Sequence, residues 1–575
     1  MDPSNTALAA DFSEIAALLR ASRADRFRVR AYERAARVLR ALPVAVADLD
    51  AAEVRALSGI GPAMAGVLVE RLASGRIGML EELRAQEPPG FGALVDLPLI
   101  GLRDARRLAA AHGIRDVAAL RAAAADAEQL TAFGKRLAAR VRESLRREAT
   151  VADPRLPLAR AQREARALAD GLAGLPGVEE VLAAGAVRRG VDLVGDFDLV
   201  VGVEPGAAGA VAAALPGSPA VVRALERQAC RVRVVTPTGH PALLWTAEQA
   251  ALGSALLCAT GPSDHVARLA ERAGRRGLEL RPDGLWQAGP RRAARDEAAI
   301  YDRLGLPPIP PELREDDTAV EVAAAGRLPA LVRAGDLRGD LHVHTDFSGD
   351  GTDSMLEVVR GAAGRGYDYI ALTDHAENLT INGMPRAAVL ARRRTIAEVQ
   401  QRHPHVRILD AAELNIGLDG ALDYDLGFLL DFELGVASVH SHMDRPAAEQ
   451  TERILSAIAH PAVNVIGHPT GRIIGHRPGY AIDLAAIAQA ATETGTALEV
   501  NGSPARLDLD AAMIRAAVQA GAMLSLSSDA HSIAELDAIA NAVTTARRGW
   551  AQASDVLNTR PLDGLLAMVA RKRAR

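Results

Sequence analysis

The C-terminal part of the chain shows the clearest alternation of apolar and polar positions. From residue 337 to the end, short apolar segments alternate with stretches in which apolar residues recur at helical spacing. Strands that alternate with helices predict parallel pairing, here among seven strands. The predicted strands are DLHVH (340–344), YIALTDH (369–375), RILDAAE (407–413), LGVASVH (434–440), VNVIGH (463–468), ALEVN (497–501) and MLSLSSDAH (523–531).

The upstream chain shows four other patterns. Residues 1–150 predict short helices separated by glycine-containing hairpins, and residues 251–318 are mixed and end in LGLPPIPPELRE. A polar, alanine-rich connector follows, to residue 336. Residues 155–250 contain strand-like segments, and Thr238–Gly239–His240 predicts a hairpin turn between the last two of them. The segments are VEEVLAAGAV, DFDLVVGVE, CRVRVVTP and PALLWTA.

Composition indicates an ordinary globular protein, with 49% hydrophobic and 24% charged residues. No stretch approaches the roughly 18 apolar residues of a membrane span, and the N-terminus lacks a signal-peptide pattern. The two cysteines, Cys230 and Cys258, provide no disulfide framework. We therefore expect a cytoplasmic protein without a membrane partner.

Charge is unevenly distributed along the chain. The net charge is −5, yet residues 1–150 carry 23 Lys/Arg against 19 Asp/Glu, a balance of +4, which leaves −9 for the rest. A mildly basic front and an acidic, metal-binding back fit these numbers, and so does a random scatter of charges.

Histidine carries the strongest chemical signal. Of 14 histidines, 11 lie between residues 342 and 531, and six of the seven predicted strands end in His, Asp or Glu. Because the C-terminal ends of parallel barrel strands meet at one rim, these side chains should converge. Imidazole and carboxylate together suit zinc, manganese or iron, and such ions activate water for phosphoester hydrolysis.

These segments resemble the PHP (polymerase and histidinol phosphatase) family throughout 337–575, through HVH, SGDG, TDH, AEL, VHSH, GHPTGR and SSDAH. The resemblance implies a distorted (β/α)7 barrel with up to three metal ions. Further, His442 and Arg472 could contact phosphate, and Asp340 and Asp374 could orient ligand histidines. The implied ligands are His342, His344, Asp350, His375, Glu413, His440, His468, Asp529 and His531.

The N-terminal region contains glycine hairpins between predicted helices. In LSGIGPAMAGVLVERL (57–72), Gly59 and Gly61 would let backbone N–H groups approach a phosphate at a helix N-terminus. This segment resembles the helix-hairpin-helix of family X DNA polymerases. LPLIGLRDARRL (97–108), with Gly101, and TAFGKRLAARV (131–141), with Gly134 and Lys135, resemble further hairpins, so these residues are implied DNA contacts.

The segment AGAVRRGVDLVGDFDLVV (184–201) resembles the palm of the same family. Asp196 and Asp198 alternate along one strand, so both carboxylates point to one face. The resemblance implies that they hold Mg²⁺ and a nucleotide triphosphate, together with Gly185, Arg188 and Arg189. TGPSDHVARLAERAGRRGLEL (260–280) and GLPPIPPELRE (305–315) resemble the thumb.

Together these pieces resemble bacterial family X DNA polymerases with a C-terminal PHP domain. The implied domains are a helix-hairpin-helix domain (1–83), a fingers-like helix-hairpin-helix region (84–150), a nucleotidyltransferase palm (151–252), a thumb (253–318), a linker (319–336) and the PHP domain (337–575). The fold class is thus multidomain, with a helical N-terminal region, an α+β palm and thumb and the barrel.

The chain departs from that family in three respects. The family's third palm Asp corresponds to Leu243 in an ungapped alignment, or to Arg231 if the earlier strand is used, and Ala186 replaces a serine of the phosphate loop. Residues 1–134 also contain no lysine for the family's lyase chemistry. Weak or absent synthesis is therefore expected, since a lost general base alone costs about 10²–10⁴ in rate.

We expect an enzyme of DNA repair whose PHP domain hydrolyses phosphoesters at DNA 3′ ends as a 3′–5′ exonuclease, with Mn²⁺ or instead Zn²⁺ or Fe²⁺. Its partners would be gapped or primer–template DNA, with dNTP as a further candidate, and no obligate protein partner is expected. Three alternatives stay open: an active template-directed polymerase with PHP proofreading, a small-molecule phosphatase, and a non-catalytic DNA scaffold.

Overall fold

The computed structural model describes residues 5–21, 26–41, 46, 54, 60–86, 94, 100, 102–134, 137–142, 144–145, 155–228, 230–379 and 382–574. The chain divides into two compact units, Met1–Asp153 and Pro154–Arg575. Each unit is described by itself below.

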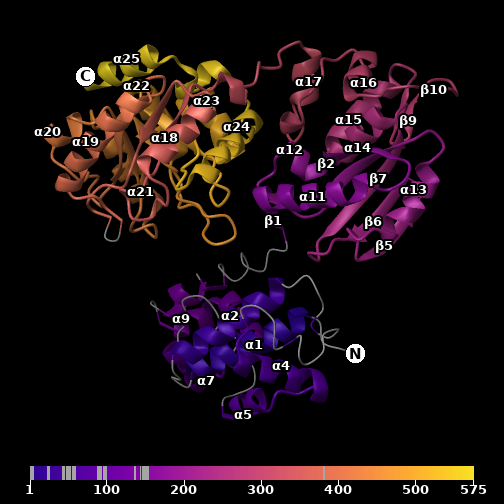
Figure 1. Ribbon diagram of the computed structural model, residues 1–575, viewed down its shortest axis with the longest axis horizontal. Coiled ribbons are helices and arrows are strands. Elements are labelled where there is room, and N and C mark those ends of the chain that lie inside the picture. Colours follow the sequence, from indigo (N-terminus) through magenta and orange to yellow (C-terminus); the bar gives the residue numbers. More distant parts are fainter. Residues whose placement is uncertain are drawn as a thin grey trace. The chain divides into compact units, whose positions relative to one another are not determined.

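The first unit is helical in its described residues, as predicted (Figure 1). Amphipathic helices bury two separate apolar clusters: one contains Phe12 and Leu39, and the other contains Leu108 and Phe133. The helices are α1 (Asn5–Ala21), α2 (Arg26–Ala41), α4 (Pro62–Ser74), α5 (Gly78–Gln86), α7 (Leu102–His112), α8 (Val117–Ala125) and α9 (Ala127–Ala132).

The second unit begins with a five-stranded sheet in the order β2-β4-β7-β6-β5. The predicted hairpin turn joins β6 to β7, where Gly239 adopts a φ of 86°. The first predicted strand is too long, because Gly185, at a φ of 58°, starts a helix. The elements are β1 (Leu156–Pro157), α11 (Leu158–Ala173), β2 (Val178–Ala184), α12 (Gly185–Arg189), β3 (Leu193–Val194), β4 (Phe197–Val203), α13 (Ala208–Ala214), β5 (Arg223–Gln228), β6 (Arg231–Val235) and β7 (Pro241–Glu248).

The next segment packs helices and a small sheet around Tyr301 and Leu257. It includes part of the predicted linker, because the apolar face of α17 joins this core through Val320 and Ala323. The elements are α14 (Leu252–Thr260), α15 (Ser263–Gly274), β8 (Glu279–Arg281), β9 (Gly284–Trp286), β10 (Arg291–Arg292), α16 (Glu297–Arg303) and α17 (Ala319–Ala324).

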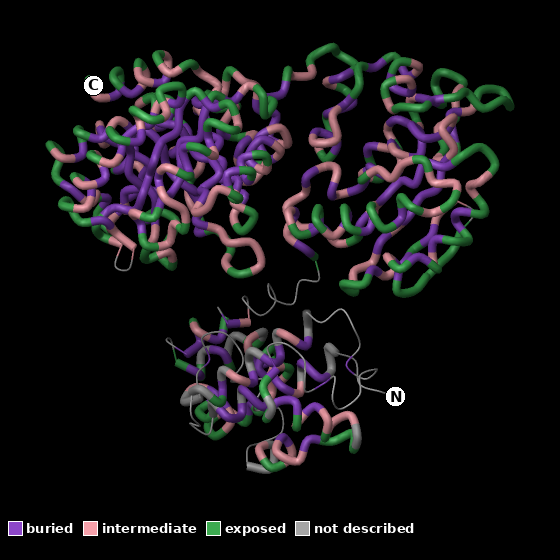
Figure 2. The backbone as a smooth tube through the Cα atoms, in the orientation of Figure 1, coloured by how far each residue is buried: buried purple, intermediate pink, exposed green. Residues whose placement is uncertain are grey.

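The C-terminal segment is a barrel of seven parallel strands in sequence order, as predicted. The sheet closes between its first and last strands, where the N–H of His344 donates to the carbonyl of Ala530. The strands are buried on both sides, which explains their nearly continuous apolar character (Figure 2). They are β11 (Gly339–Val343), β12 (Tyr369–Leu372), β13 (Arg407–Asn415), β14 (Leu434–Ser438), β15 (Val465–Ile466), β16 (Ala497–Asn501) and β17 (Met523–Ser527).

Helices surround the barrel strands (Figure 1). Within the described part of the chain, no helix is both long and apolar enough to cross a bilayer. The surrounding helices are α18 (Met355–Gly364), α19 (Arg386–Arg402), α20 (Leu426–Leu430), α21 (Ala447–Ala459), α22 (Leu484–Thr494), α23 (Ala511–Gln519), α24 (Ile539–Arg548) and α25 (Leu562–Arg573).

Candidate metal centre and palm site

The C-terminal strand ends bring all nine predicted ligand side chains together. Their possible ligand atoms form three groups, each with all of its atoms within 4.8 Å of one another. His468 joins them, because its Nε2 lies 2.9 Å from Glu413 Oε1. The groups are His344, Asp350, His375 and His531; His342, His344 and Asp529; and His375, Glu413 and His440.

The donor atoms of this cluster fit metal ions. Nε2 of His342, Nε2 of His344 and Oδ1 of Asp350 are buried without a hydrogen-bond partner. Since an unpaired buried polar atom is costly, a cation is the natural partner for this set. The three groups share His344 and His375, so they form one continuous donor cluster.

Three ligand side chains already have the protonation state that binds a metal, whereas for His342 and His375 nearby carboxylates outweigh burial and raise the pKa of both imidazoles. Burial lowers the pKa of His344 to about 4, so its imidazole is neutral at pH 7. Burial would raise the pKa of Glu413 and of Asp529, but the surrounding histidines hold both values well below the usual range. The two carboxylates are therefore anionic.

Two residues not predicted from sequence orient ligand imidazoles. Glu499 Oε1 lies 2.7 Å from His342 Nδ1, and Asn415 Oδ1 lies 2.7 Å from His440 Nδ1. Both contacts leave Nε2 free for a metal. A buried carboxylate within the strand ALEVN was the available signal for Glu499.

Asp340 and Asp374 support the rim differently from the prediction. Asp340 accepts from the backbone N–H groups of His342 and Ser528, and Asp374 accepts from Thr345 and Ser348. They hold the loops that carry the ligands, rather than the imidazole rings.

The described contacts of the two predicted phosphate-binding residues, His442 and Arg472, do not include the ligand side chains. Arg472 is engaged by Asp192, at 2.7 Å, and by backbone carbonyls. His442 is exposed, and none of its described contacts joins its ring to the ligands. Instead Arg506 reaches the centre, with its Nε 3.3 Å from Asp529 Oδ2. No motif in the sequence pointed to Arg506.

Of the two palm carboxylates, Asp198 lies in β4, whereas Asp196 lies in the bend just before that strand and not, as predicted from the sequence, within it. Gly185 packs against Asp198, where a Cβ would lie 2.1 Å from Oδ2. Burial raises the pKa of Asp198 to about 6. Asp196 instead is half-exposed and accepts from Arg233 Nη2 at 2.7 Å.

The pairing of β4 with β7 and of β7 with β6 shows which side chains of the later strands face the two carboxylates. Asp198 pairs with Leu243 on β7, which pairs with Arg233 on β6, so the three side chains share one face. Arg231 stacks over Trp245, with its guanidinium 4.9 Å from the ring centroid. The side chain that reaches Asp196 is therefore Arg233, and neither Leu243 nor Arg231.

The predicted phosphate-binding arginines are already paired. Arg188 makes a bidentate ion pair with Glu297, and Arg189 contacts Glu315 and the carbonyl of Thr260. Arg314 and Arg188 hold the pKa of the buried Glu297 at about 2, against the effect of its burial. A nucleotide would have to compete with these carboxylates.

Three of the five predicted hairpin contacts, Gly59, Gly101 and Lys135, lie outside the described residues. Gly61 precedes α4 at a φ of −74°, and a Cβ there would meet no atom within 4 Å. The fold itself thus does not require this glycine. Gly134 adopts a φ of 79°, which favours glycine.

Comparisons with known proteins agree with this architecture. Three family models match: a helix-hairpin-helix domain at residues 3–77, a DNA polymerase beta thumb at 255–315 and a PHP domain at 340–503. The DNA polymerase/3'-5' exonuclease PolX of Bacillus subtilis is 31% identical over 555 residues, 95% of each chain. A probable phosphatase of Thermoanaerobacter sp. is 29% identical over 230 residues, 38% of this chain and 89% of that one.

Proposed function

Because the chain belongs to the family X DNA polymerases that carry a PHP domain, we propose that its barrel hydrolyses phosphodiesters at DNA 3′ ends and that its palm synthesises DNA only weakly. The observation that carries the hydrolytic part is the convergence of nine donor side chains, several with buried atoms that lack a partner. Gapped or primer–template DNA is the proposed substrate, and no obligate protein partner is invoked.

The chain's own residues have separate tasks at this centre. Bound Mn²⁺, or instead Zn²⁺ or Fe²⁺, would neutralise charge that develops on the phosphate during hydrolysis. Glu499 keeps the Nε2 of His342 directed at the metal site. Arg506, beside Asp529, offers a guanidinium to the phosphate.

The test of hydrolysis is digestion of a 5′-labelled primer–template with Mn²⁺. We expect His342→Ala/His344→Ala to abolish shortening while DNA binding, measured by fluorescence anisotropy, persists. His403→Ala/His405→Ala is the matched control, because it removes two imidazoles with the same spacing outside the cluster. Shortening by the first double variant at the native rate would exclude the barrel as the nuclease.

Weak synthesis rests on the ion pair between Arg233 and Asp196. A catalytic metal needs carboxylate ligands, whereas the guanidinium brings a fixed positive charge to the same carboxylate. A palm metal, Mg²⁺ if one binds, would be held by Asp196 and Asp198 and would have to displace Arg233. We therefore propose that primer extension is slow compared with trimming.

Single-turnover nucleotide incorporation tests this part. Arg233→Asp should raise incorporation. Leu243→Asp tests the position on β7 that pairs with Arg233. Arg227→Asp makes the same charge change on the exposed edge strand and should have no effect. Fast incorporation by the native chain that disappears in Asp196→Ala would mean that the palm is active as it stands.

That outcome would support a second function, template-directed synthesis with PHP proofreading. The specific observation in its favour is the match to PolX of Bacillus subtilis over 95% of both chains, palm included. The extension assay with dNTPs distinguishes the two functions directly, since one predicts lengthening of the primer and the other predicts shortening.

A further inference from the structure

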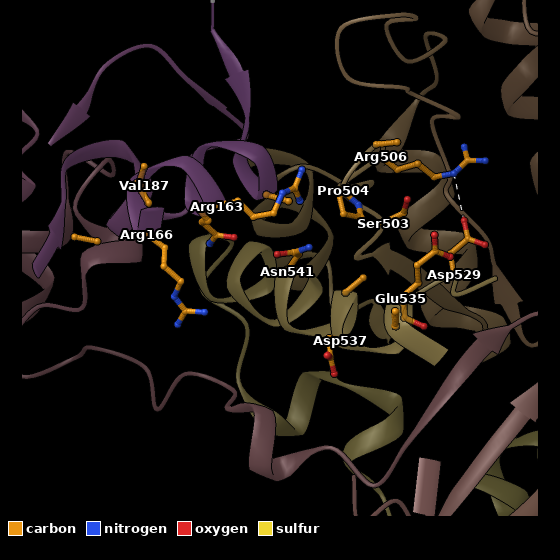
Figure 3. Close-up of a pocket in the computed structure, with 18 of the residues that line it drawn as sticks. Arg163, Arg166, Val187, Ser503, Pro504, Arg506, Asp529, Glu535, Asp537 and Asn541 are labelled. Carbon is orange, nitrogen blue, oxygen red and sulfur yellow. Dashed lines mark ion pairs between the residues drawn. The ribbon is translucent and has the colours of Figure 1, made fainter. Parts of the chain in front are cut away.

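A large cavity beside the metal centre is shared between the barrel and the palm. It has a volume of about 1190 Å³, above the range of roughly 300–1,000 Å³ that is typical of small-molecule pockets. Three candidate ligands, Asp350, Asp529 and His531, lie in its barrel wall, and helix α11 of the palm contributes to the opposite wall (Figure 3). The space thus extends well beyond what one phosphate ester at the metals would occupy.

Specific contacts within the second unit hold the two walls together. Asp192 of the palm accepts from Arg472 at 2.7 Å and from Arg548 at 2.6 Å. Leu507 of the barrel is buried in the apolar cluster of the palm. These contacts fix the palm residues beside the barrel, so they form a wall of the cavity.

Basic side chains outnumber acidic ones on the palm wall, where Arg163, Arg166 and Arg188 line the cavity together with Asp170. Arg163 and Arg166, one helical turn apart on α11, line the cavity and are exposed. Neither makes an ion pair or side-chain hydrogen bond with any residue that the structure describes. The acidic residues of the barrel wall are engaged: Asp537 pairs with Arg365, Glu535 accepts from the N–H of His531, and Asp350 and Asp529 belong to the metal centre.

This arrangement suits a phosphate chain whose end lies at the metals. We propose that Arg163 and Arg166 bind backbone phosphates of the strand that the barrel degrades, so that the palm helix is part of the nuclease substrate site and selects DNA over small phosphate esters. The inference rests on the proposed nuclease function. Both arginines are positioning residues, since neither belongs to the ligand cluster.

The test compares two substrates of the full-length protein with Mn²⁺: a 5′-labelled single-stranded oligonucleotide and bis(p-nitrophenyl) phosphate, a single phosphodiester that has no further backbone phosphates. For Arg163→Ala/Arg166→Ala, we expect KM for the oligonucleotide to rise about ten-fold or more. The slope of log KM against log salt should fall by roughly 1.4, as expected for two lost phosphate contacts. Hydrolysis of bis(p-nitrophenyl) phosphate should be unchanged.

Two further variants keep the result specific. Arg163→Lys/Arg166→Lys retains the charges and should restore most of the affinity. Arg223→Ala/Arg227→Ala removes two exposed arginines from β5, an edge strand of the palm sheet, and this variant should behave as the native chain.

The outcomes separate this inference from the function on which it rests. If the native chain hydrolyses both substrates and Arg163→Ala/Arg166→Ala digests the oligonucleotide normally, the inference is wrong and the nuclease stands. An equal loss on both substrates, or an equal loss in the β5 control, also overturns it. If the native chain hydrolyses neither substrate, the proposed nuclease fails and this inference falls with it.

Discussion

At the scale of single residues, the metal centre depends on how each imidazole is held. His342 is fully buried, and burial alone would lower its pKa; Glu499, Glu413 and Asp529 raise it well above the usual value instead. Two candidate ligands, His468 and Asp529, adopt positive φ angles of 26° and 55°. Such conformations cost energy in residues other than glycine and are often found at functional sites.

Glu499→Gln tests the role of the carboxylate that orients His342. The amide keeps the shape of the side chain but loses the negative charge, so we expect metal affinity to fall by about 10–100-fold. The measurement is the Mn²⁺ concentration that gives half-maximal hydrolysis of bis(p-nitrophenyl) phosphate. Glu493→Gln, exposed on α22, is the control, and an unchanged Mn²⁺ requirement in Glu499→Gln would contradict the assignment.

At the scale of elements, buried charges attach individual helices to the barrel. The guanidinium of Arg392 on α19 is fully buried and donates to Asp374 at 2.9 Å and to Asp410 at 2.7 Å. Because Asp374 also holds the loop of Thr345 and Ser348, this helix is connected to the metal rim.

Arg392→Ala should destabilise the barrel strongly. It would leave Asp374 without its cation in a fully buried position, which typically costs about 3–5 kcal/mol. The urea midpoint of the barrel transition, followed by circular dichroism, should fall accordingly. Arg394→Ala, exposed on the same helix, should leave the midpoint in place; equal midpoints for the two variants would refute the role of the buried network.

Helix α25 is attached by a buried amine. Lys572 donates to the carbonyl of Ile458 at 2.9 Å and to the hydroxyl of Thr496, and burial lowers its pKa to about 7. Between pH 7 and about 10.4, the unfolded chain therefore binds a proton that the folded chain does not bind. In this window the contribution of Lys572 to stability increases as pH rises.

Comparison with Lys572→Met isolates this contribution. The free energy of unfolding of the native chain, minus that of the variant, should increase by about 2 kcal/mol from pH 7 to pH 9. Urea unfolding at the two pH values provides the measurement. A difference that stays constant would show that the amine keeps its ordinary pKa, and one that decreases with pH would show that its pKa is raised instead; either result contradicts the prediction.

At the scale of the whole molecule, Asp192 connects palm and barrel within the second unit. Its side chain is about 20% exposed and accepts from Arg472 and Arg548, which belong to the barrel. The prediction that Arg472 binds phosphate is thus replaced by a structural role for this arginine. Arg548 also contacts Glu315, which in turn contacts Arg189 of the palm.

Asp192→Asn should loosen this connection by roughly 1–2 kcal/mol, allowing for its partial exposure. We expect the thermal midpoint of the second unit to fall by a few °C, as measured by calorimetry. Oligonucleotide digestion should slow, while bis(p-nitrophenyl) phosphate hydrolysis persists. Asp317→Asn, exposed in the thumb region, is the control; identical melting and digestion in both variants would rule out the connection.

Much of this architecture follows from local patterns in the sequence. Apolar strands that alternate with helices predict a parallel barrel, because only parallel strands need such crossovers, and six predicted strands end in ligand-type residues. Strand ends of a parallel barrel meet at one rim whatever the details of packing, so the nine donors could be predicted as a set. The hairpin turn before β7 is equally local, since Gly239 supplies its positive φ.

Other features depend on contacts between distant segments, and the tertiary structure alone decides them. Arg506 and Glu499 reach the metal centre, and Arg233 reaches Asp196, because strand register and loop packing place them there. An alignment without gaps could not identify Arg233, since its position depends on how β6 pairs with β7. Arg472 matched a motif, yet its orientation is set by Asp192, 280 residues away, and no local pattern reports a contact across that separation.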